Sequence, residues 1–86
     1  MVSCKILVTD PAGLHLRSAG EFVDEMNRFA SSVTILFKDQ KIDGKSLLNI
    51  MMGCIKCGAE IEVECSGEDE AEALAAAIRI IGNELT

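Results

Sequence analysis

The chain has 86 residues, 49% of them hydrophobic, and a formal net charge of −6 at pH 7. This length suits one domain with a modest core, so we expect a single domain over residues 1–86. A pI near 4.6 argues against a nucleic-acid binder, which would carry a basic patch. No apolar run approaches the ~20 residues that a membrane-spanning helix needs.

The amino-terminal segment is not typical of a secretory signal. Lys5 interrupts its short apolar run, and no small-residue cleavage site follows. We therefore expect a cytoplasmic protein whose four cysteines are reduced thiols.

The first part of the chain alternates and then changes period. Every second residue from Val2 to Thr9 falls on one apolar face, which predicts a strand. Asp10-Pro11-Ala12-Gly13 is a turn signal. From about Leu16 to Arg28 the spacing is three and four, which predicts a helix, and Ser18 and Glu21 have capping-box spacing. The expected buried positions are Val2, Cys4, Ile6, Val8, Ala19, Phe22, Val23, Met26 and Ala30.

The second part predicts a hairpin, a short helix, a strand and a long helix. Alternation around Val33, Ile35 and Phe37, a polar turn and the short "KID" indicate the hairpin. Ser46 is a natural N-cap for a short helix. "AEIEVEC" alternates clearly, and "SGEDEAEALAAAIRIIGNEL" favours a helix that Gly82-Asn83 ends. We expect Ile61, Val63 and Cys65 to face inward, and Ala71, Leu74, Ala75, Ile78 and Leu85 to form the buried stripe of the last helix.

The resulting order is β-α-β-β-α-β-α. Strands with one polar face belong to a sheet that is covered on one side only. The helices then form the second layer, so the fold class is a two-layer α+β sandwich.

His15 is the only histidine, and it lies where the turn meets the helix. The first helical turn offers unpaired N–H groups and a positive dipole end, which favour an anion. Arg17 adds a guanidinium that fits phosphate oxygens, and histidine is a competent nucleophile. These residues indicate a phosphate bound to His15, although histidine at a helix start also has purely structural uses.

Other enzyme classes have little support. No Ser-His-Asp set can be assembled, and Gly44-Lys45-Ser46 lacks the earlier glycine of a P-loop. Cys54 and Cys57 form a C-x-x-C, but structural zinc usually needs two such pairs. Cys4 and Cys65 are expected to point inward, so a metal or redox function is the weaker interpretation.

The short helix after Ser46 is apolar nearly all round. It cannot bury all of Leu47, Leu48, Met51 and Met52 against a one-sided sheet, so some should be exposed. An exposed apolar patch often marks a partner surface. The competing interpretations are that Ser46 is only a helix cap and that the helix only fills a gap in the core.

Taken together, these residues resemble the HPr family, the histidine-containing phosphocarriers of the bacterial sugar phosphotransferase system. "DPAGLHLRSA" resembles the active-site motif, with His15 and Arg17 in the matching positions, and "GKSLLNIMMG" resembles the regulatory-serine segment, with Ser46 in its place. "GAEIEVECSGEDEAEAL" resembles the last strand and helix. The likeness covers essentially the whole chain and implies an open-faced β-sandwich of four antiparallel strands with three helices on one face.

The resemblance implies that His15, through Nδ1, accepts a phosphoryl group from enzyme I, itself charged by phosphoenolpyruvate. The group then passes to an enzyme IIA domain of a sugar transporter, with no cofactor and no metal, and Arg17 stabilises the phosphate. It implies a monomer and a regulatory phosphorylation site at Ser46 for an HPr kinase/phosphorylase. Leu47, Leu48 and Met51 would form the docking patch for these partners.

Two positions depart from the family pattern and leave alternatives open. Leu16 stands where the family usually has alanine, and Ser18 where it usually has proline, a residue that pre-sets the first helical turn. One alternative is an HPr-like regulatory paralogue that acts mainly through Ser46 and a transcriptional regulator. Another is a plain α+β binding module without phosphorylation.

Overall fold

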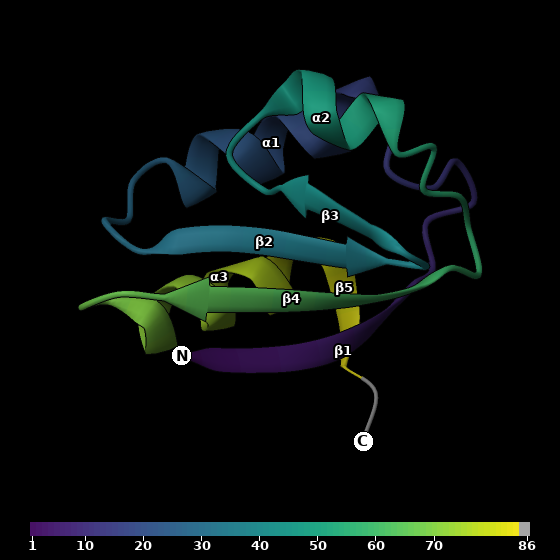
Figure 1. Ribbon diagram of the computed structural model, residues 1–86. Helices are drawn as coiled ribbons and strands as arrows, with labels where there is room; N and C mark the ends of the chain where they lie inside the picture. The colour runs from purple at the N-terminus through teal and green to yellow at the C-terminus, as the bar shows by residue number, and fades with distance from the viewer. Residues whose placement is uncertain (85–86) are drawn as a thin grey trace.

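The computed structural model describes residues 1–84 and shows three helices on one face of an antiparallel sheet (Figure 1). The predicted order β-α-β-β-α-β-α is confirmed, and one short strand follows it. None of the helices in residues 1–84 combines the length and the apolar character that a membrane span requires. The elements are β1 Val2–Val8, α1 Leu16–Met26, β2 Ser32–Phe37, β3 Gln40–Asp43, α2 Leu47–Met52, β4 Glu60–Ser66, α3 Glu70–Ile81 and β5 Gly82–Glu84.

The strands lie in the order β3-β2-β4-β1-β5, and every neighbouring pair is antiparallel. Val63 of the central strand β4 pairs with Cys4 on one side and with Ile35 on the other. Because side chains alternate along a strand, this register places the apolar residues of all three strands on the same face. That face is the one the helices cover.

Strand β5 was not predicted. The last helix ends at Ile81, close to the predicted end, but the chain then turns at Gly82, which has a φ of +123°, and pairs with β1. A three-residue strand is too short to show a period in the sequence, and only glycine adopts this backbone conformation readily. The four predicted strands therefore form the sheet, and β5 extends its edge.

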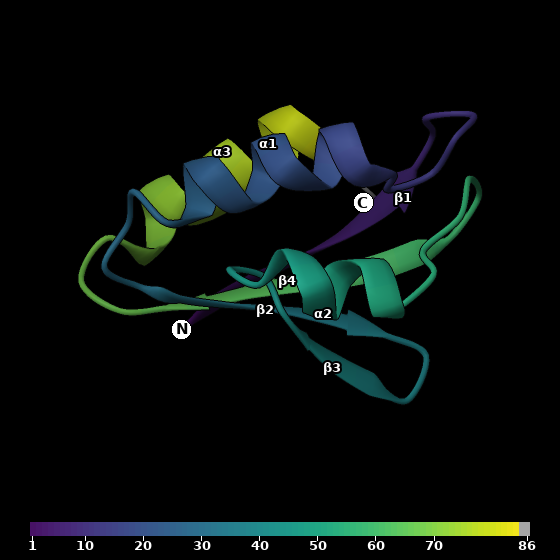
Figure 2. The same cartoon turned by 90° about the horizontal axis from the view of Figure 1, so that it is seen from above.

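Helix α1 packs between α2 and α3, which Figure 2 shows from above. Its fully buried residues Ala19, Phe22 and Met26 are among those predicted. Ala30 is exposed, contrary to expectation, because α1 already ends at Met26.

The predicted buried stripe of α3 was wrong. Ala71 and Ala75 are exposed, and Leu74 and Ile78 are only half-buried. This helix is apolar on most sides, so the sequence pattern fits several orientations equally well. In the orientation that the structure shows, mostly small side chains of α3 face the sheet and α1. The buried residues are Ala73, Ala76, Ala77 and Ile81, and Leu85 lies outside the described residues.

The Asp69 carboxylate ties the start of α3 to the segment before β2. It accepts hydrogen bonds from the backbone N–H groups of Ala30 and Ser31, each at 2.9 Å, and from the Ser31 hydroxyl. The Ser31 hydroxyl, followed by the Ala30 N–H, lowers the pKa of Asp69 below its ordinary value of 3.8. These bonds are stronger to the charged carboxylate than to the neutral acid, so the connection between the two elements weakens when Asp69 is protonated.

This contact predicts a pH dependence of stability. A carboxyl group whose pKa is lowered on folding contributes stability above its unfolded pKa and loses that contribution as the pH falls. We expect the unfolding free energy of the wild type to drop below about pH 4, and to drop less in Asp69→Asn. Urea denaturation on both sides of this pH, with the exposed Glu72→Gln as control, measures the difference. The same loss of unfolding free energy between the two pH values in wild type and Asp69→Asn would show that the Asp69 contact does not cause the pH dependence.

Candidate functional site

The loop between β1 and α1 is a closed turn built by Asp10. Its Oδ1 accepts a hydrogen bond from the Ala12 N–H at 2.9 Å, and its carbonyl accepts one from the Gly13 N–H at 2.8 Å. Aspartate forms such turns because its short side chain reaches the backbone two residues ahead. The turn delivers the chain to the start of α1 in a fixed direction.

A second loop, residues 53–59, holds this turn in place. The Leu14 N–H donates to the Ile55 carbonyl at 3.0 Å, and the two loops lie at the same end of the molecule in Figure 2. Gly13 has a φ of +69°, and a Cβ there would lie 2.5 Å from the Ile55 oxygen and 2.7 Å from the Lys56 Cα. Only glycine combines this conformation with so close an approach.

His15 is the N-cap residue of α1, with extended backbone angles. Its carbonyl accepts the first intrahelical hydrogen bond, from the Ala19 N–H at 2.8 Å. The N–H groups of residues 16–18 precede that bond, and such groups have no partner within a helix. The imidazole is 37% exposed, and its Nε2 lies 3.4 Å from Asp10 Oδ2.

Ser18 occupies the third helical position and is not the N-cap, so the predicted Ser18–Glu21 capping box was wrong. The N-cap residue, His15, lies three residues before Ser18, and these two residues form the box. The Ser18 hydroxyl accepts from the His15 N–H at 3.2 Å and donates to the His15 carbonyl at 3.3 Å. The Ser18 hydroxyl thus holds the backbone of His15 at the start of the helix.

The Arg17 side chain lies in the first turn of α1 and is 86% exposed. Its Nε is 3.9 Å from Glu21 Oε1. Although Arg17 is only two residues from His15, within residues 1–84 its guanidinium pairs with Glu21 and forms no ion pair or hydrogen bond with the imidazole. Exposed ion pairs of this kind contribute little to stability. The guanidinium can therefore leave Glu21 for a stronger anion.

Ser46 is the N-cap of α2, as predicted. Its Oγ accepts hydrogen bonds from the Asn49 backbone N–H at 3.2 Å and from Asn49 Nδ2 at 3.0 Å. The Ser46 N–H donates to the Asp43 carbonyl at 3.1 Å. The hydroxyl thus lies at the start of a helix, where added negative charge is favoured.

The predicted exposure of apolar residues on α2 is confirmed. Leu48 and Met52 are 69% and 72% exposed, whereas Leu47 and Met51 are half-buried against the core. At the start of α1, Leu16 is 65% exposed. We call Leu16, Leu48 and Met52 the exposed apolar residues; of these the sequence placed only Leu48 in the docking patch.

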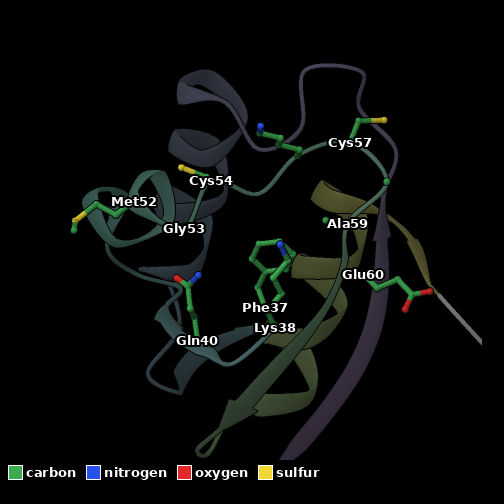
Figure 3. A pocket seen from close by; sticks show the side chains of 11 residues that line it. Phe37, Lys38, Gln40, Met52, Gly53, Cys54, Cys57, Ala59 and Glu60 are labelled. Atoms are coloured by element: carbon green, nitrogen blue, oxygen red, sulfur yellow. The ribbon is translucent and has the colours of Figure 1, made fainter.

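Cys54 and Cys57 line an open hollow of about 860 Å³ between the β2–β3 turn and the loop after α2 (Figure 3). Their side chains point in different directions in this view, and they approach different carbonyls, those of Met51 and Thr9. Within residues 1–84, no three His, Cys, Asp or Glu side chains are grouped to hold a metal ion. Cys65 is buried as expected, and this burial raises the pKa of its thiol, while Cys4 is half-buried.

Sequence reasoning missed two parts of this site. The sequence identifies Asp10 only as a turn residue and does not indicate its contact with His15. The support that the Ile55 carbonyl gives to Leu14 joins residues far apart in the chain, so no local pattern could reveal it. The Asp-Pro-x-Gly signal did indicate the turn, and an aspartate five residues before the histidine was the available clue.

Comparison with known proteins places the chain in one family. A family model described as "PTS HPr component phosphorylation site" matches residues 2–83. The phosphocarrier protein HPr of Mycoplasma capricolum is 34% identical over 76 residues, which cover 88% of this chain and 85% of that protein. The crystal structure of HPr from Bacillus anthracis superposes with a TM-score of 0.90 at 32% identity, covering 94% of this chain and 96% of the other.

A second kind of relative is the HPr-like protein Crh of Bacillus subtilis. It is 39% identical over 74 residues, which cover 86% of this chain and 87% of Crh. A crystal structure of Crh, described as a swapped dimer, superposes with a TM-score of 0.76 at 36% identity, covering 94% of this chain and 93% of the other. With its fold, its His15 turn and these relatives together, the chain belongs to the HPr family of phosphocarrier proteins.

Proposed function

We propose that this protein carries a phosphoryl group on His15, taking it from enzyme I and passing it to an enzyme IIA domain of a sugar transporter. One observation carries the proposal: a half-exposed imidazole is fixed at the N-cap of α1, beside the N–H groups that begin the helix. A phosphoryl group bonded to that ring lies where backbone donors and the helix dipole favour negative charge.

The chemistry requires a rigid base and an open approach. The lone pair of a ring nitrogen attacks the phosphorus of the donor, the donor's bond to phosphorus breaks, and its electron pair stays with the donor. Arg17, held only by an exposed ion pair, is the group that then turns toward the phosphate oxygens. The same exposure lets a second protein take the group away.

Reconstitution with purified partners tests the proposal. The protein is added to phosphoenolpyruvate, enzyme I and an enzyme IIA domain, and the phosphorylation of enzyme IIA is followed. We expect no transfer without the protein and transfer at catalytic amounts of it. A folded protein that supports no transfer with enzyme I and IIA from the same source would contradict the proposal.

We propose that the exposed apolar residues supply the docking surface. Leu16 lies directly after the phosphoryl acceptor, and Leu48 and Met52 lie on α2. Methionine suits a surface that meets several partners, because its side chain is flexible and polarisable. We propose that this surface, backed by Leu47 and Met51, binds enzyme I and enzyme IIA in turn, and that the protein works as a cytoplasmic monomer.

A regulatory function through Ser46 is the second candidate. The likeness to Crh and the position of Ser46 beside Leu47 and Leu48 favour it. Phosphorylation adds about −1.5 to −2 charges at neutral pH. An HPr kinase/phosphorylase would add them at the edge of the docking surface, where they weaken enzyme I binding and create a site for a transcriptional regulator.

Paired substitutions at Ser46 separate charge from helix capping. Aspartate is also a good N-cap, so Ser46→Asp should change stability little and slow enzyme I-dependent phosphorylation about tenfold, a cost of about 1.4 kcal/mol. Ser46→Ala should lose about 1 kcal/mol of stability and keep the wild-type rate. Rates come from timed phosphorylation and stabilities from urea denaturation. An unchanged rate in Ser46→Asp would refute the regulatory role of this charge.

A further inference from the structure

We infer that Asp10 is a positioning residue for His15: its carboxylate keeps the imidazole proton on Nε2 and leaves Nδ1 to bond phosphorus. The inference deepens the proposed function and rests on it for the transfer step. The contact that carries it is the 3.4 Å approach of Asp10 Oδ2 to His15 Nε2.

The Asp10 carboxylate is held by the turn that it builds. One oxygen, Oδ1, accepts from the Ala12 N–H at 2.9 Å, while the other, Oδ2, faces the imidazole. The backbone of Asp10 is also fixed, through the bond from Gly13, and Gly13 is packed against residues 55 and 56. The Asp10 carboxylate is therefore held in place by its turn, whereas a surface carboxylate without such bonds would sample many positions.

The position of the carboxylate selects one ring nitrogen. A neutral imidazole carries its proton on one nitrogen, and the group facing that nitrogen decides which. A carboxylate accepts hydrogen bonds and does not donate them, so a proton on Nε2 is favoured beside Asp10. The lone pair is then on Nδ1.

The same contact supports the transfer itself. When Nδ1 bonds phosphorus and the donor departs with its electron pair, the ring keeps the Nε2 proton and gains a positive charge. The Asp10 carboxylate offsets that charge from the far side of the ring. When an acceptor takes the phosphoryl group, the electron pair of the N–P bond returns to Nδ1 and the ring is neutral again.

The two nearby carboxylates pair with different basic side chains, one with His15 and the other with Arg17. The Glu21 carboxylate lies 3.9 Å from Arg17 Nε, whereas the Asp10 carboxylate lies 3.4 Å from His15 Nε2. Each basic side chain of the motif thus has its own acidic partner. Arg17 can move to the phosphate without disturbing the proton on Nε2.

Nitrogen NMR of the free protein tests the inference without enzyme I. Asp10→Asn keeps an oxygen for the Ala12 N–H but removes the charge that faces Nε2. Asp24→Asn, an exposed carboxylate farther along α1, is the matched control. With neutral imidazole, we expect the ring nitrogen shifts of the wild type and Asp24→Asn to report mainly the Nε2–H form, and Asp10→Asn to shift toward a mixture.

Transfer rates complete the test. We expect Asp10→Asn to slow phosphoryl transfer about tenfold, which corresponds to about 1.4 kcal/mol of transition-state stabilisation, with Asp24→Asn unchanged. The same nitrogen shifts in Asp10→Asn and wild type would overturn the inference while leaving the proposed function intact. If Asp10→Asn changes the tautomer but the wild type accepts no phosphoryl group, the positioning role is supported and the proposed function is overturned.

Discussion

His15→Ala is expected to abolish phosphorylation by enzyme I and phosphoenolpyruvate completely, because it removes the ring that we propose bonds phosphorus. The His15 side chain packs at the surface, 37% exposed, so the variant should remain folded. The readout is enzyme I-dependent release of pyruvate, which should amount to one equivalent per wild-type molecule and none for the variant.

Arg17→Ala is the companion to this test. Arginine contributes charge-assisted hydrogen bonds and no covalent bond, and each such bond is worth about 1.5–3 kcal/mol, so the rate should fall roughly 10- to 100-fold without reaching zero. Pyruvate release from His15→Ala equal to that of wild type would show that the phosphoryl group is carried elsewhere.

The largest stability effect near the site is expected from Gly13→Ala. The added methyl group meets the Ile55 oxygen at 2.5 Å and forces a non-glycine residue to a φ of +69°. A left-handed conformation costs about 1–2 kcal/mol and overpacking about 1–3 kcal/mol, so the unfolding free energy should fall by about 2–5 kcal/mol.

Gly20→Ala is the matched control, seven positions along the chain. A Cβ at Gly20 meets no atom within 4 Å, and the residue lies inside α1. Alanine should stabilise that helix by about 0.5–1 kcal/mol. Urea denaturation measures both, and opposite signs are the expected result. A Gly13→Ala variant as stable as wild type would mean that the two loops are not held together as described.

The sequence predicts those parts of the fold that follow from neighbouring residues alone, such as alternating strands and helix caps. Strand β4 alternates strictly, and its predicted inward-facing residues Ile61, Val63 and Cys65 are all buried. The N-cap role of Ser46 is also local, and it was predicted correctly. The α3 stripe failed because a helix rich in alanine has no unique apolar face, so packing against α1 decides which side is buried.

The site was predictable only in part for the same reason. His15, Arg17 and Ser18 belong to one turn of chain, so the sequence placed them together, although it gave Ser18 the wrong position in the cap. The support from Ile55 depends on how two distant loops meet. The contact between Asp10 and His15 depends on the exact path of the turn, which the Gly13 conformation sets.

Intact-mass analysis after incubation with enzyme I and phosphoenolpyruvate decides whether His15 carries a phosphoryl group. We expect one added phosphoryl group on the wild-type protein and none on His15→Ala. The added group should be lost in acid and retained in base, as expected for phosphorus bonded to nitrogen. A folded wild-type protein that gains no phosphoryl group, or gains one that survives acid, would contradict the claim that His15 is the carrier. The first result would favour a plain binding module, and the second would favour phosphorylation at a hydroxyl such as Ser46.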